Sequence, residues 1–320
     1  MNCLCCNKPL TENETASQWH RQCIRRFFDT KEMPCVQVSE ELLEQLATES
    51  INKGFTVPGV QKKLSLHLSQ EDTPRLTLVN YPTGYILKPQ TEEYTSLPEA
   101  EFLVMQMAKK SGICTVDFAL LRMNENANTL AYITKRADRM FERKNHCVQM
   151  LAMEDFCQLE GRLTQDKYKG SYERCAKVIE TFSSRKMLDL TELFLRMVFS
   201  FVTGNSDMHL KNFSLIEEKE NRGSYCLSAA YDLLPVNVIL PEDKDQFALT
   251  MNGKKRNIRK KDFFIFAQTI GLPEKAAEKI IRKIVSMQSQ YLQMCEESYL
   301  PTEMKESFKQ LICERMLVLK

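Results

Sequence analysis

A long apolar segment followed at once by a polar loop constrains the fold of this chain most strongly. Large apolar side chains recur at three- and four-residue spacing at Leu190, Leu193, Phe194, Met197, Val198 and Phe201. This spacing predicts a helix over 188–203 with a broad buried face, and Gly204 is the residue expected to end it. Similar apolar spacing returns at 280–287, so we expect 138–320 to be a mainly helical domain.

Residues 34–137 carry a different pattern. Alternating or β-prone residues predict short strands at 64–68, 76–79, 85–87 and 132–134. One helix interrupts them, because Ser96 and Glu99 match a capping box and apolar residues continue from there to Gly112. A β-rich part followed by a helical part indicates an α+β fold of two lobes, and the cleft between two such lobes is a natural ligand site.

Composition narrows the class of protein. The chain has 320 residues, a formal net charge of +2 and 43% hydrophobic residues, which is ordinary for a globular protein. No apolar run approaches the roughly 18 residues of a transmembrane helix, and the first residues do not resemble a signal peptide. We therefore expect a cytoplasmic protein with reduced cysteines, without membrane contact and without direct binding of nucleic acid.

The loop 204–212 carries the clearest chemical pattern. Asp207 and Asn212 lie five positions apart, an offset that protein kinases use in their catalytic loop. There the Asp accepts the proton of the substrate hydroxyl and the Asn ligates Mg²⁺, so we predict these roles for Asp207 and Asn212. His209 could orient the loop, and Lys211 could reach the transferring phosphate. The alternative is a polar loop whose Asp and Asn are incidental.

Three more residues extend this pattern. Asp232 follows a predicted hairpin at 212–228, where kinases place their second Mg²⁺ ligand. Lys88 ends an apolar strand, and its burial is costly unless it pairs with phosphate or carboxylate. Kinases pair such a strand lysine with a helix glutamate to hold the ATP phosphates, which favours Glu101 as its partner. Glu99 lies nearby, and we interpret it as the capping residue.

Residues 54–63 form a candidate loop over the nucleotide. Backbone N–H groups in such a loop can face phosphate oxygens, and we assign Val57, Gly59 and Gln61 to this contact. The loop holds only two glycines, and Pro58 lacks an N–H. The alternative is an ordinary surface loop.

In this order and spacing, the motifs resemble the HipA family of toxin Ser/Thr kinases. The matching segments are 57–63, 86–89, 135–139, 154–158, 167–168, 204–215 and 231–235. The resemblance implies a bilobal protein-kinase-like fold that uses ATP and Mg²⁺. It implies the same roles for Lys88, Asp207, Asn212 and Asp232 as the residues themselves predict. It also places Thr134, Lys135 and Ala137 at the inter-lobe hinge beside the adenine.

The resemblance has consequences for regulation and partners. Thr56 occupies the position at which family kinases phosphorylate their own Gly-rich loop, although Ser is more usual there. A dianion at that point would repel the triphosphate of ATP. Known substrates of these toxins are aminoacyl-tRNA synthetases. Few residues precede the loop, so the chain looks like the short, split HipT-like form, for which we expect a small HipS-like partner and a DNA-binding HipB-like antitoxin.

The first 33 residues form a separate Cys-rich segment. Cys3 and Cys6 make a C-x-x-C pair, and His20 and Cys23 follow as H-x-x-C. Three thiolates and an imidazole at this spacing suit a tetrahedral structural Zn²⁺ with no open position. Cys5 is a spare or alternative ligand. The competing interpretation is a disordered, reduced N-terminal arm.

The sequence therefore predicts an ATP- and Mg²⁺-dependent Ser/Thr protein kinase, a toxin of a HipA/HipT-type system. A small-molecule or lipid kinase with the same machinery is one alternative, because the loop chemistry does not select the substrate. A catalytically silent binding module is the other. The presence of all four residues Lys88, Asp207, Asn212 and Asp232 argues against a silent module.

Overall fold

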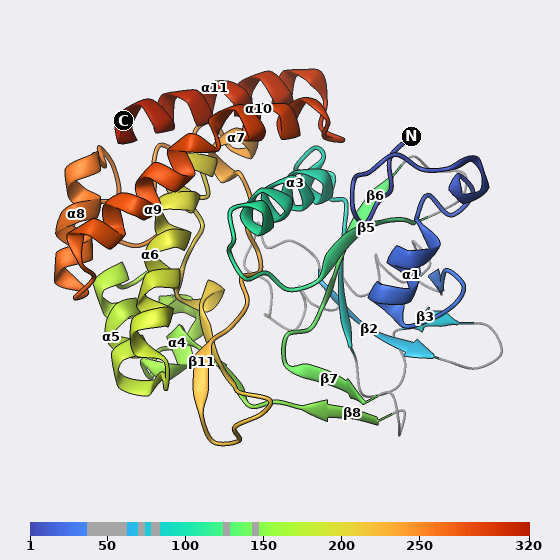
Figure 1. Cartoon of the computed structure of the whole chain (residues 1–320), viewed down its shortest axis with the longest axis horizontal. Coiled ribbons are helices and arrows are strands. Elements are labelled where there is room, and N and C mark those ends of the chain that lie inside the picture. The colour runs from blue at the N-terminus through green and yellow to red at the C-terminus, as the bar shows by residue number, and fades with distance from the viewer. Residues whose placement is uncertain (37–62, 70–73, 78–83, 124–128, 143–146) are drawn as a thin grey trace. The chain divides into compact units, whose positions relative to one another are not determined.

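The computed structural model describes residues 1–36, 63–69, 74–77, 84–123, 129–142 and 147–320 (Figure 1). The chain divides into two compact units. Unit 1 comprises Met1–Phe102 and Asp117–Val148, and unit 2 comprises Leu103–Val116 and Gln149–Lys320. Most strands belong to unit 1 and most helices to unit 2, so the prediction of an α+β fold is confirmed.

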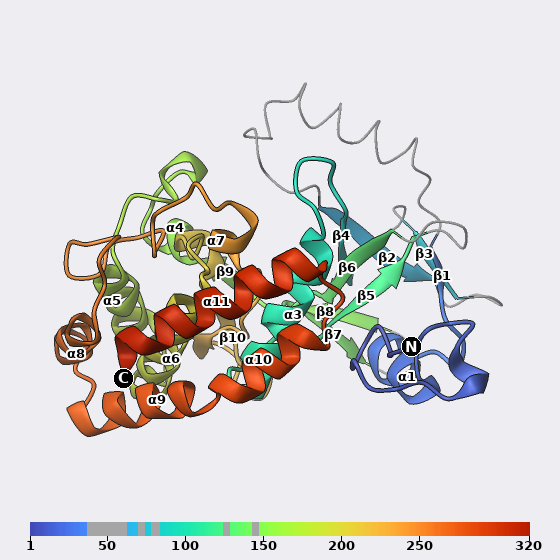
Figure 2. The same cartoon turned by 90° about the horizontal axis from the view of Figure 1, so that it is seen from above.

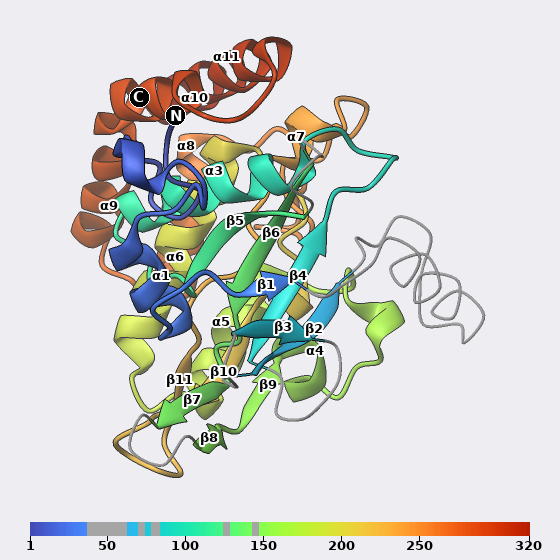
Figure 3. The same ribbon diagram turned by 90° about the vertical axis from the view of Figure 1, so that its right-hand side faces the viewer.

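A six-stranded sheet in the order β1-β3-β2-β4-β6-β5 forms the centre of unit 1 (Figure 3). Its strands are β1 (Cys35–Val36), β2 (Leu64–Ser69), β3 (Arg75–Thr77), β4 (Tyr85–Pro89), β5 (Phe118–Arg122) and β6 (Leu130–Lys135). Neighbouring strands are antiparallel except β1 and β3, which pair in parallel. The strands predicted at 64–68, 85–87 and 132–134 are confirmed. The strand predicted at 76–79 is described only at its start, and residues 78 and 79 lie outside the described residues.

Alternation explains why these segments form a sheet. In β2, Leu64, Leu66 and Leu68 are buried, and Ser65 between them is exposed. Side chains along a strand point to opposite faces in turn, so this alternation gives the sheet one apolar face. The remaining strands of this region form a two-stranded sheet of β7 (Arg139–Glu142) and β8 (Cys147–Met150).

The N-terminal segment packs onto this sheet through aromatic rings. It contains the short helix η1 (Glu12–Glu14) and the helix α1 (Arg21–Phe28). Trp19 contacts Phe27 and Phe28 at ring distances of 5.6 and 5.4 Å, and both phenylalanines contact Tyr85 of β4. The segment is therefore joined to the strand that carries Lys88.

Helix α3 (Leu97–Lys110) matches the predicted helix, but its start differs from the prediction. The Gln90 side chain accepts a hydrogen bond from the Leu97 N–H at 3.2 Å. Ser96 has a φ of +54°, a left-handed conformation. Gln90, rather than a capping box of Ser96 and Glu99, thus satisfies the first orphan N–H of the helix. The division between the two units falls within α3.

Helix α6 (Lys186–Thr203) is the centre of unit 2, and α5, α9 and α11 pack against it (Figure 2). The other helices are α4 (Phe156–Leu159), η2 (Thr164–Asp166), α5 (Tyr172–Phe182), η3 (Leu210–Asn212), α7 (Val236–Ile239), α8 (Lys260–Thr269), α9 (Glu274–Ser286), α10 (Gln288–Glu296) and α11 (Thr302–Leu319). Every residue from Leu193 to Thr203 is buried, which confirms the predicted buried helix over 188–203. No helix among the described residues is long and apolar enough to cross a bilayer.

A three-stranded sheet lies beside these helices in the order β11-β10-β9. Its strands are β9 (Met153–Asp155), β10 (Ser214–Glu217) and β11 (Tyr225–Leu227). The first strand of the hairpin was predicted to begin at Asn212. This was wrong, because Asn212 is the last residue of the short helix η3 and β10 begins at Ser214. The turn of η3 sets the Asn212 side chain back toward the loop that precedes it.

Gly204 ends α6 in the left-handed conformation, with φ +67°, and a Cβ at this position would meet the side chains of Leu311 and Asn237. We predict that Gly204→Ala destabilises the protein by about 2–3 kcal/mol, from backbone strain and overpacking together. Gly271 has a φ of +72° but no atom within 4 Å of an added Cβ, so Gly271→Ala is the matched control for strain alone. Urea unfolding measures both. Equal free energies of unfolding for the two variants would contradict the packing argument.

Candidate active site

The loop after α6 is closed by a hydrogen bond between the predicted base and a predicted Mg²⁺ ligand. The amide nitrogen of Asn212 donates to the backbone carbonyl of Asp207 at 2.8 Å, and Asn212 is buried. Because the nitrogen is used inside the loop, the Asn212 amide oxygen is the atom left for a ligand. No donor bonds to that oxygen among the residues with described positions. Amide oxygens of this kind are suitable ligands for Mg²⁺.

A tyrosine bonds directly to the predicted base. The Tyr168 hydroxyl donates to the Asp207 carboxylate at 2.7 Å, and the Tyr168 ring lies edge-on to the His209 imidazole at 5.1 Å. Burial, with the negative charge of Asp207, raises the pKa of Tyr168, so its hydroxyl stays protonated as a donor. No role was predicted for Tyr168. Its place in the family motif at 167–168 was the available signal.

His209 lies in the middle of this cluster. Burial lowers the pKa of His209, and the charges of Asp207 and Asp232 only partly offset this effect. The imidazole is therefore neutral at pH 7. Asp232 also contributes to the raised pKa of Tyr168. Asp207 and Asp232 thus both act electrostatically on Tyr168 and His209, although Asp232 is 25 residues from Asp207 in the sequence.

Tyr231 ties the Asp232 segment to the loop. The Tyr231 hydroxyl donates to the backbone carbonyl of Lys211 at 3.1 Å and is bonded to the Ser214 hydroxyl at 2.6 Å. Asp232 itself has a φ of +61°, which is uncommon for a residue other than Gly. Such backbone strain is held in place by its surroundings and is frequent at functional sites. The sequence alone gave no sign of this contact.

Lys211 does not point freely into the site. Its ammonium lies 2.6 Å from the carboxylate of Asp155, the last residue of β9. Asp155 also caps α4, because it accepts a hydrogen bond from the Gln158 N–H. This ion pair holds the positive charge of Lys211 next to Asp155. The predicted contact of Lys211 with a phosphate would require the pair to open or to share a donor.

Further hydrogen bonds hold the first half of the loop. The Ser206 hydroxyl donates to Asp243 at 2.7 Å, and the Asn237 N–H donates to the Gly204 carbonyl at 3.0 Å. The Tyr172 hydroxyl donates to the Met208 carbonyl at 3.1 Å. Catalysis by positioning requires side chains held by their own supports, and this loop has them on several sides.

Unit 1 contains the lysine and glutamate of the sequence pattern. Lys88 Nζ lies 2.5 Å from the Glu101 carboxylate, and both side chains are buried, with 4% and 0% of their surface exposed. The Lys88 ammonium also lies 5.3 Å from the centre of the Tyr132 ring. Glu99 is not the partner of Lys88. Burial raises the pKa of Glu99, and one of its oxygens accepts no hydrogen bond from any residue that the structure describes.

The predicted hinge residues belong to the end of β6 and the turn after it. The Thr134 hydroxyl donates to the Asp117 carbonyl at 2.9 Å, and Lys135 Nζ donates to the Arg26 carbonyl at 3.2 Å. Ala137 lies in the following turn. The candidate nucleotide loop falls outside the described residues, as do its four assigned positions: Thr56, Val57, Gly59 and Gln61.

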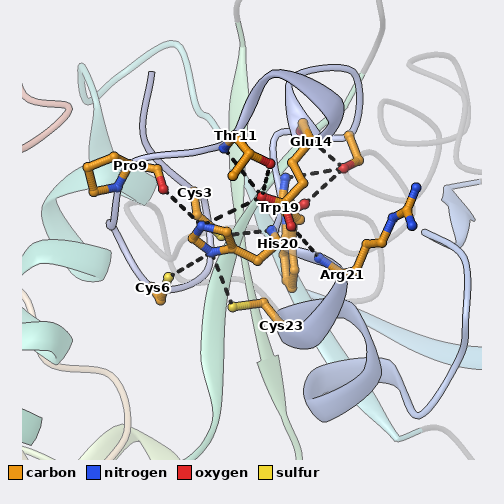
Figure 4. Close-up of polar contacts among 10 residues, drawn as sticks. Cys3, Cys6, Pro9, Thr11, Glu14, Trp19, His20, Arg21 and Cys23 are labelled. Atoms are coloured by element: carbon orange, nitrogen blue, oxygen red, sulfur yellow. Dashed lines mark hydrogen bonds and ion pairs between the residues drawn. The ribbon is translucent and has the colours of Figure 1, made fainter.

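The four predicted zinc ligands come together in unit 1 (Figure 4). The sulfurs of Cys3, Cys6 and Cys23 and one ring nitrogen of His20 all lie within 4.8 Å of one another. This cluster could hold a metal ion.

Comparisons with known proteins identify relatives of this chain. A family model described as HipA-like C-terminal domain matches residues 55–291. A Haemophilus influenzae protein named "Putative kinase" is 27% identical over 315 residues, which cover 92% of this chain and 90% of that protein. "Putative kinase Y4dM" of Sinorhizobium fredii is 33% identical over 214 residues, which cover 63% of this chain and 50% of that protein.

Solved structures show the same fold. HipA in the Shewanella oneidensis HipA, HipB and operator DNA complex matches with a TM-score of 0.68 at 18% identity, over 85% of this chain and 70% of that one. The Helicobacter pylori proinflammatory kinase CtkA matches with a TM-score of 0.53 at 13% identity, over 80% and 95%. The predicted kinase-like fold is confirmed. With a matching family model over most of its length, the chain belongs to the HipA-like C-terminal domain family.

Proposed function

We propose that this protein is a Ser/Thr protein kinase that transfers the γ-phosphoryl group of ATP, with Mg²⁺, to a protein hydroxyl. The kinase-like fold and the relatives named as kinases support a kinase in general. The observation that carries the finer proposal is the closed loop of unit 2, in which Asn212 holds the backbone of Asp207 while Tyr168 holds its carboxylate.

Asp207 would act as the base for the substrate hydroxyl. One of its oxygens accepts from Tyr168, and a carboxylate has acceptor capacity left for a second hydroxyl. The Tyr168 bond fixes the orientation of the carboxylate. The His209 ring beside Tyr168 is neutral, so it packs against the tyrosine without adding positive charge next to Asp207. Tyr168 is therefore a positioning residue in this proposal.

Asn212 and Asp232 would hold Mg²⁺ through their side-chain oxygens. Mg²⁺ is a hard cation that prefers oxygen ligands and keeps several waters, so two protein ligands and the phosphates suffice. When bound, the ion would neutralise the charge that develops on the transferring phosphoryl group. Lys211 would add positive charge at the same loop, where Asp155 holds it in place.

Lys88 would bind the phosphates of ATP, with Glu101 orienting it. A buried ammonium needs a negative partner, and Glu101 supplies one at 2.5 Å. Thr134, Lys135 and Ala137 would lie beside the adenine, and Val57, Gly59 and Gln61 would cover the phosphates. These assignments rest on the family to which the chain belongs.

The proposed biological role is that of a toxin whose substrate is a translation component such as an aminoacyl-tRNA synthetase. The similar Shewanella HipA is in a complex with HipB and operator DNA, which supports an antitoxin of the HipB type as a partner here. A small HipS-like protein would be a second partner. Phosphorylation of Thr56 would add negative charge near the ATP phosphates and switch the enzyme off. Phosphopeptide mapping of cells that express the native chain or Asp207→Asn tests both the substrate and Thr56.

Asp207→Asn keeps the size of the side chain and an acceptor for Tyr168 but removes the base. We expect phosphoryl transfer to fall by about 10²- to 10⁴-fold, the usual contribution of general base catalysis, with thermal stability close to native. Tyr168→Phe should lose less activity, because the carboxylate remains. Transfer of labelled phosphate from ATP to lysate proteins and to small molecules measures the rates and separates protein from metabolite kinases. Native rates in Asp207→Asn would show that the base is elsewhere.

Asn212→Ala and Asp232→Asn should raise the Mg²⁺ concentration needed for half-maximal transfer, because each removes one oxygen or one charge from the metal. Asp166→Asn is the matched control, since Asp166 forms a surface ion pair with Lys169 at 2.7 Å. The measurement is a Mg²⁺ titration of the initial rate at saturating ATP. An unchanged Mg²⁺ requirement in both variants would remove them from the metal site.

Lys88→Met should destabilise the protein by about 3–5 kcal/mol, because it leaves the Glu101 charge buried without this partner. The double variant Lys88→Met/Glu101→Leu should regain much of that loss, since no charge remains to be desolvated. Both variants should lose ATP affinity. Urea unfolding and ATP titration together separate stability from binding. ATP binding at native affinity in the double variant would contradict the phosphate role of Lys88.

A further inference from the structure

We propose that Cys3, Cys6, His20 and Cys23 bind one structural Zn²⁺, and that this ion holds the N-terminal segment onto the sheet of unit 1. In a tetrahedral site with Zn–S near 2.3 Å and Zn–N near 2.1 Å, neighbouring ligand atoms lie roughly 3.5–3.8 Å apart. The His20 Nδ1 atom lies 3.3 Å from the Cys6 sulfur and 3.8 Å from the Cys23 sulfur. All four ligand atoms lie within 4.8 Å of one another. The cluster is therefore already close to the size that Zn²⁺ requires.

A hydrogen bond on one side of the His20 ring leaves the lone pair of its Nδ1 atom for the metal. The other ring nitrogen, Nε2, lies 2.9 Å from the Pro9 backbone carbonyl (Figure 4). A carbonyl oxygen can only accept, so Nε2 carries a hydrogen, and in the neutral ring Nδ1 then offers its lone pair. Metal-bound histidines usually donate their second N–H to a carbonyl or carboxylate in this way. His20 is thus oriented as a ligand by a contact outside the cluster.

Local backbone structure sets the four ligands in place. The Asn7 N–H donates to the Cys3 carbonyl and the Cys3 N–H donates to the Lys8 carbonyl, both at 2.8 Å, which closes a tight turn around Cys6. Asn7 takes the left-handed conformation that this turn needs, with φ +56°. His20 occupies the N-cap position of α1 and Cys23 lies in its first turn, so the second ligand pair comes from one end of a helix.

The neighbouring cysteine is not part of the cluster. The Cys5 sulfur accepts a hydrogen bond from the Arg26 guanidinium at 3.7 Å. The Cys5 sulfur is not among the four ligand atoms that lie within 4.8 Å of one another. A second cysteine outside the cluster, Cys35, lies in β1 and is exposed. These two residues provide controls for a test of the four ligands.

The same segment is bonded to the sheet that carries Lys88. The Leu120 N–H of β5 donates to the Leu4 carbonyl at 2.9 Å, between two of the cysteine ligands. The Tyr85 hydroxyl of β4 donates to the Phe27 carbonyl at 3.2 Å. A segment of about 30 residues has too small a core to fold alone, and metal ligation commonly supplies the missing free energy. Loss of the ion would therefore release these contacts with β4 and β5.

Metal analysis of the purified full-length chain tests the site, with about one Zn²⁺ per chain expected. Cys23→Ser and His20→Ala should each lose most of the zinc, whereas Cys5→Ser and Cys35→Ser should keep it. Replacement by Co²⁺ gives a second measurement that does not need the variants to fold, because a Co²⁺–thiolate site of tetrahedral geometry absorbs strongly in the visible. A native chain without zinc and without this Co²⁺ spectrum would overturn the proposal.

Trp19 reports on the structural role, because it is the single tryptophan of the chain and is fully buried beside α1. Treatment of the native chain with a strong chelator should shift its fluorescence to longer wavelength and lower the melting temperature, and Zn²⁺ should reverse both. Asp207→Asn should show the same changes, since its defect would be catalytic. Zinc removal that leaves the Trp19 spectrum and the melting temperature unchanged would contradict the structural role.

Discussion

The hydrogen bond from the Asn212 amide to the Asp207 carbonyl is the constraint on which the candidate active site depends. It closes the loop after α6 and leaves the Asn212 amide oxygen as the atom available for the proposed Mg²⁺. The loop can keep this shape because α6 is buried along its second half and Gly204 turns the chain out of it. The polar loop thus begins directly at a buried, well-packed helix, and Gly204 in its left-handed conformation makes the turn between them.

Two features of unit 1 need special stabilisation: a buried pair of charges and an N-terminal segment with a small core. The Lys88–Glu101 pair is stable in the interior only while both charges are present, so the sheet keeps a strong positive group in a fixed place. The N-terminal segment has only a small apolar core, built around Trp19, Phe27 and Phe28. Its cluster of three sulfurs and one imidazole offers a compact alternative to a core.

Some features of the protein follow from local sequence alone. Apolar spacing between Leu190 and Phe201 predicts α6, and alternation from Leu64 to Leu68 predicts β2. Short spacings also bring candidate residues into one loop, as with Asp207 and Asn212. These inferences hold because helix and strand periodicity is a property of neighbouring residues, and the burial of one face follows from it.

Other features were decided only by the tertiary structure. The bond of Tyr168 to Asp207 joins residues 39 positions apart, and Lys211 pairs with Asp155 across 56 positions. Gln90, not Ser96, supplies the first hydrogen bond of α3. The sequence determined which residue types were available and which local elements they form. Their partners depend on how distant elements pack, because a side chain bonds to whichever group the folded chain brings within about 3 Å, and spacing along the sequence does not encode that distance.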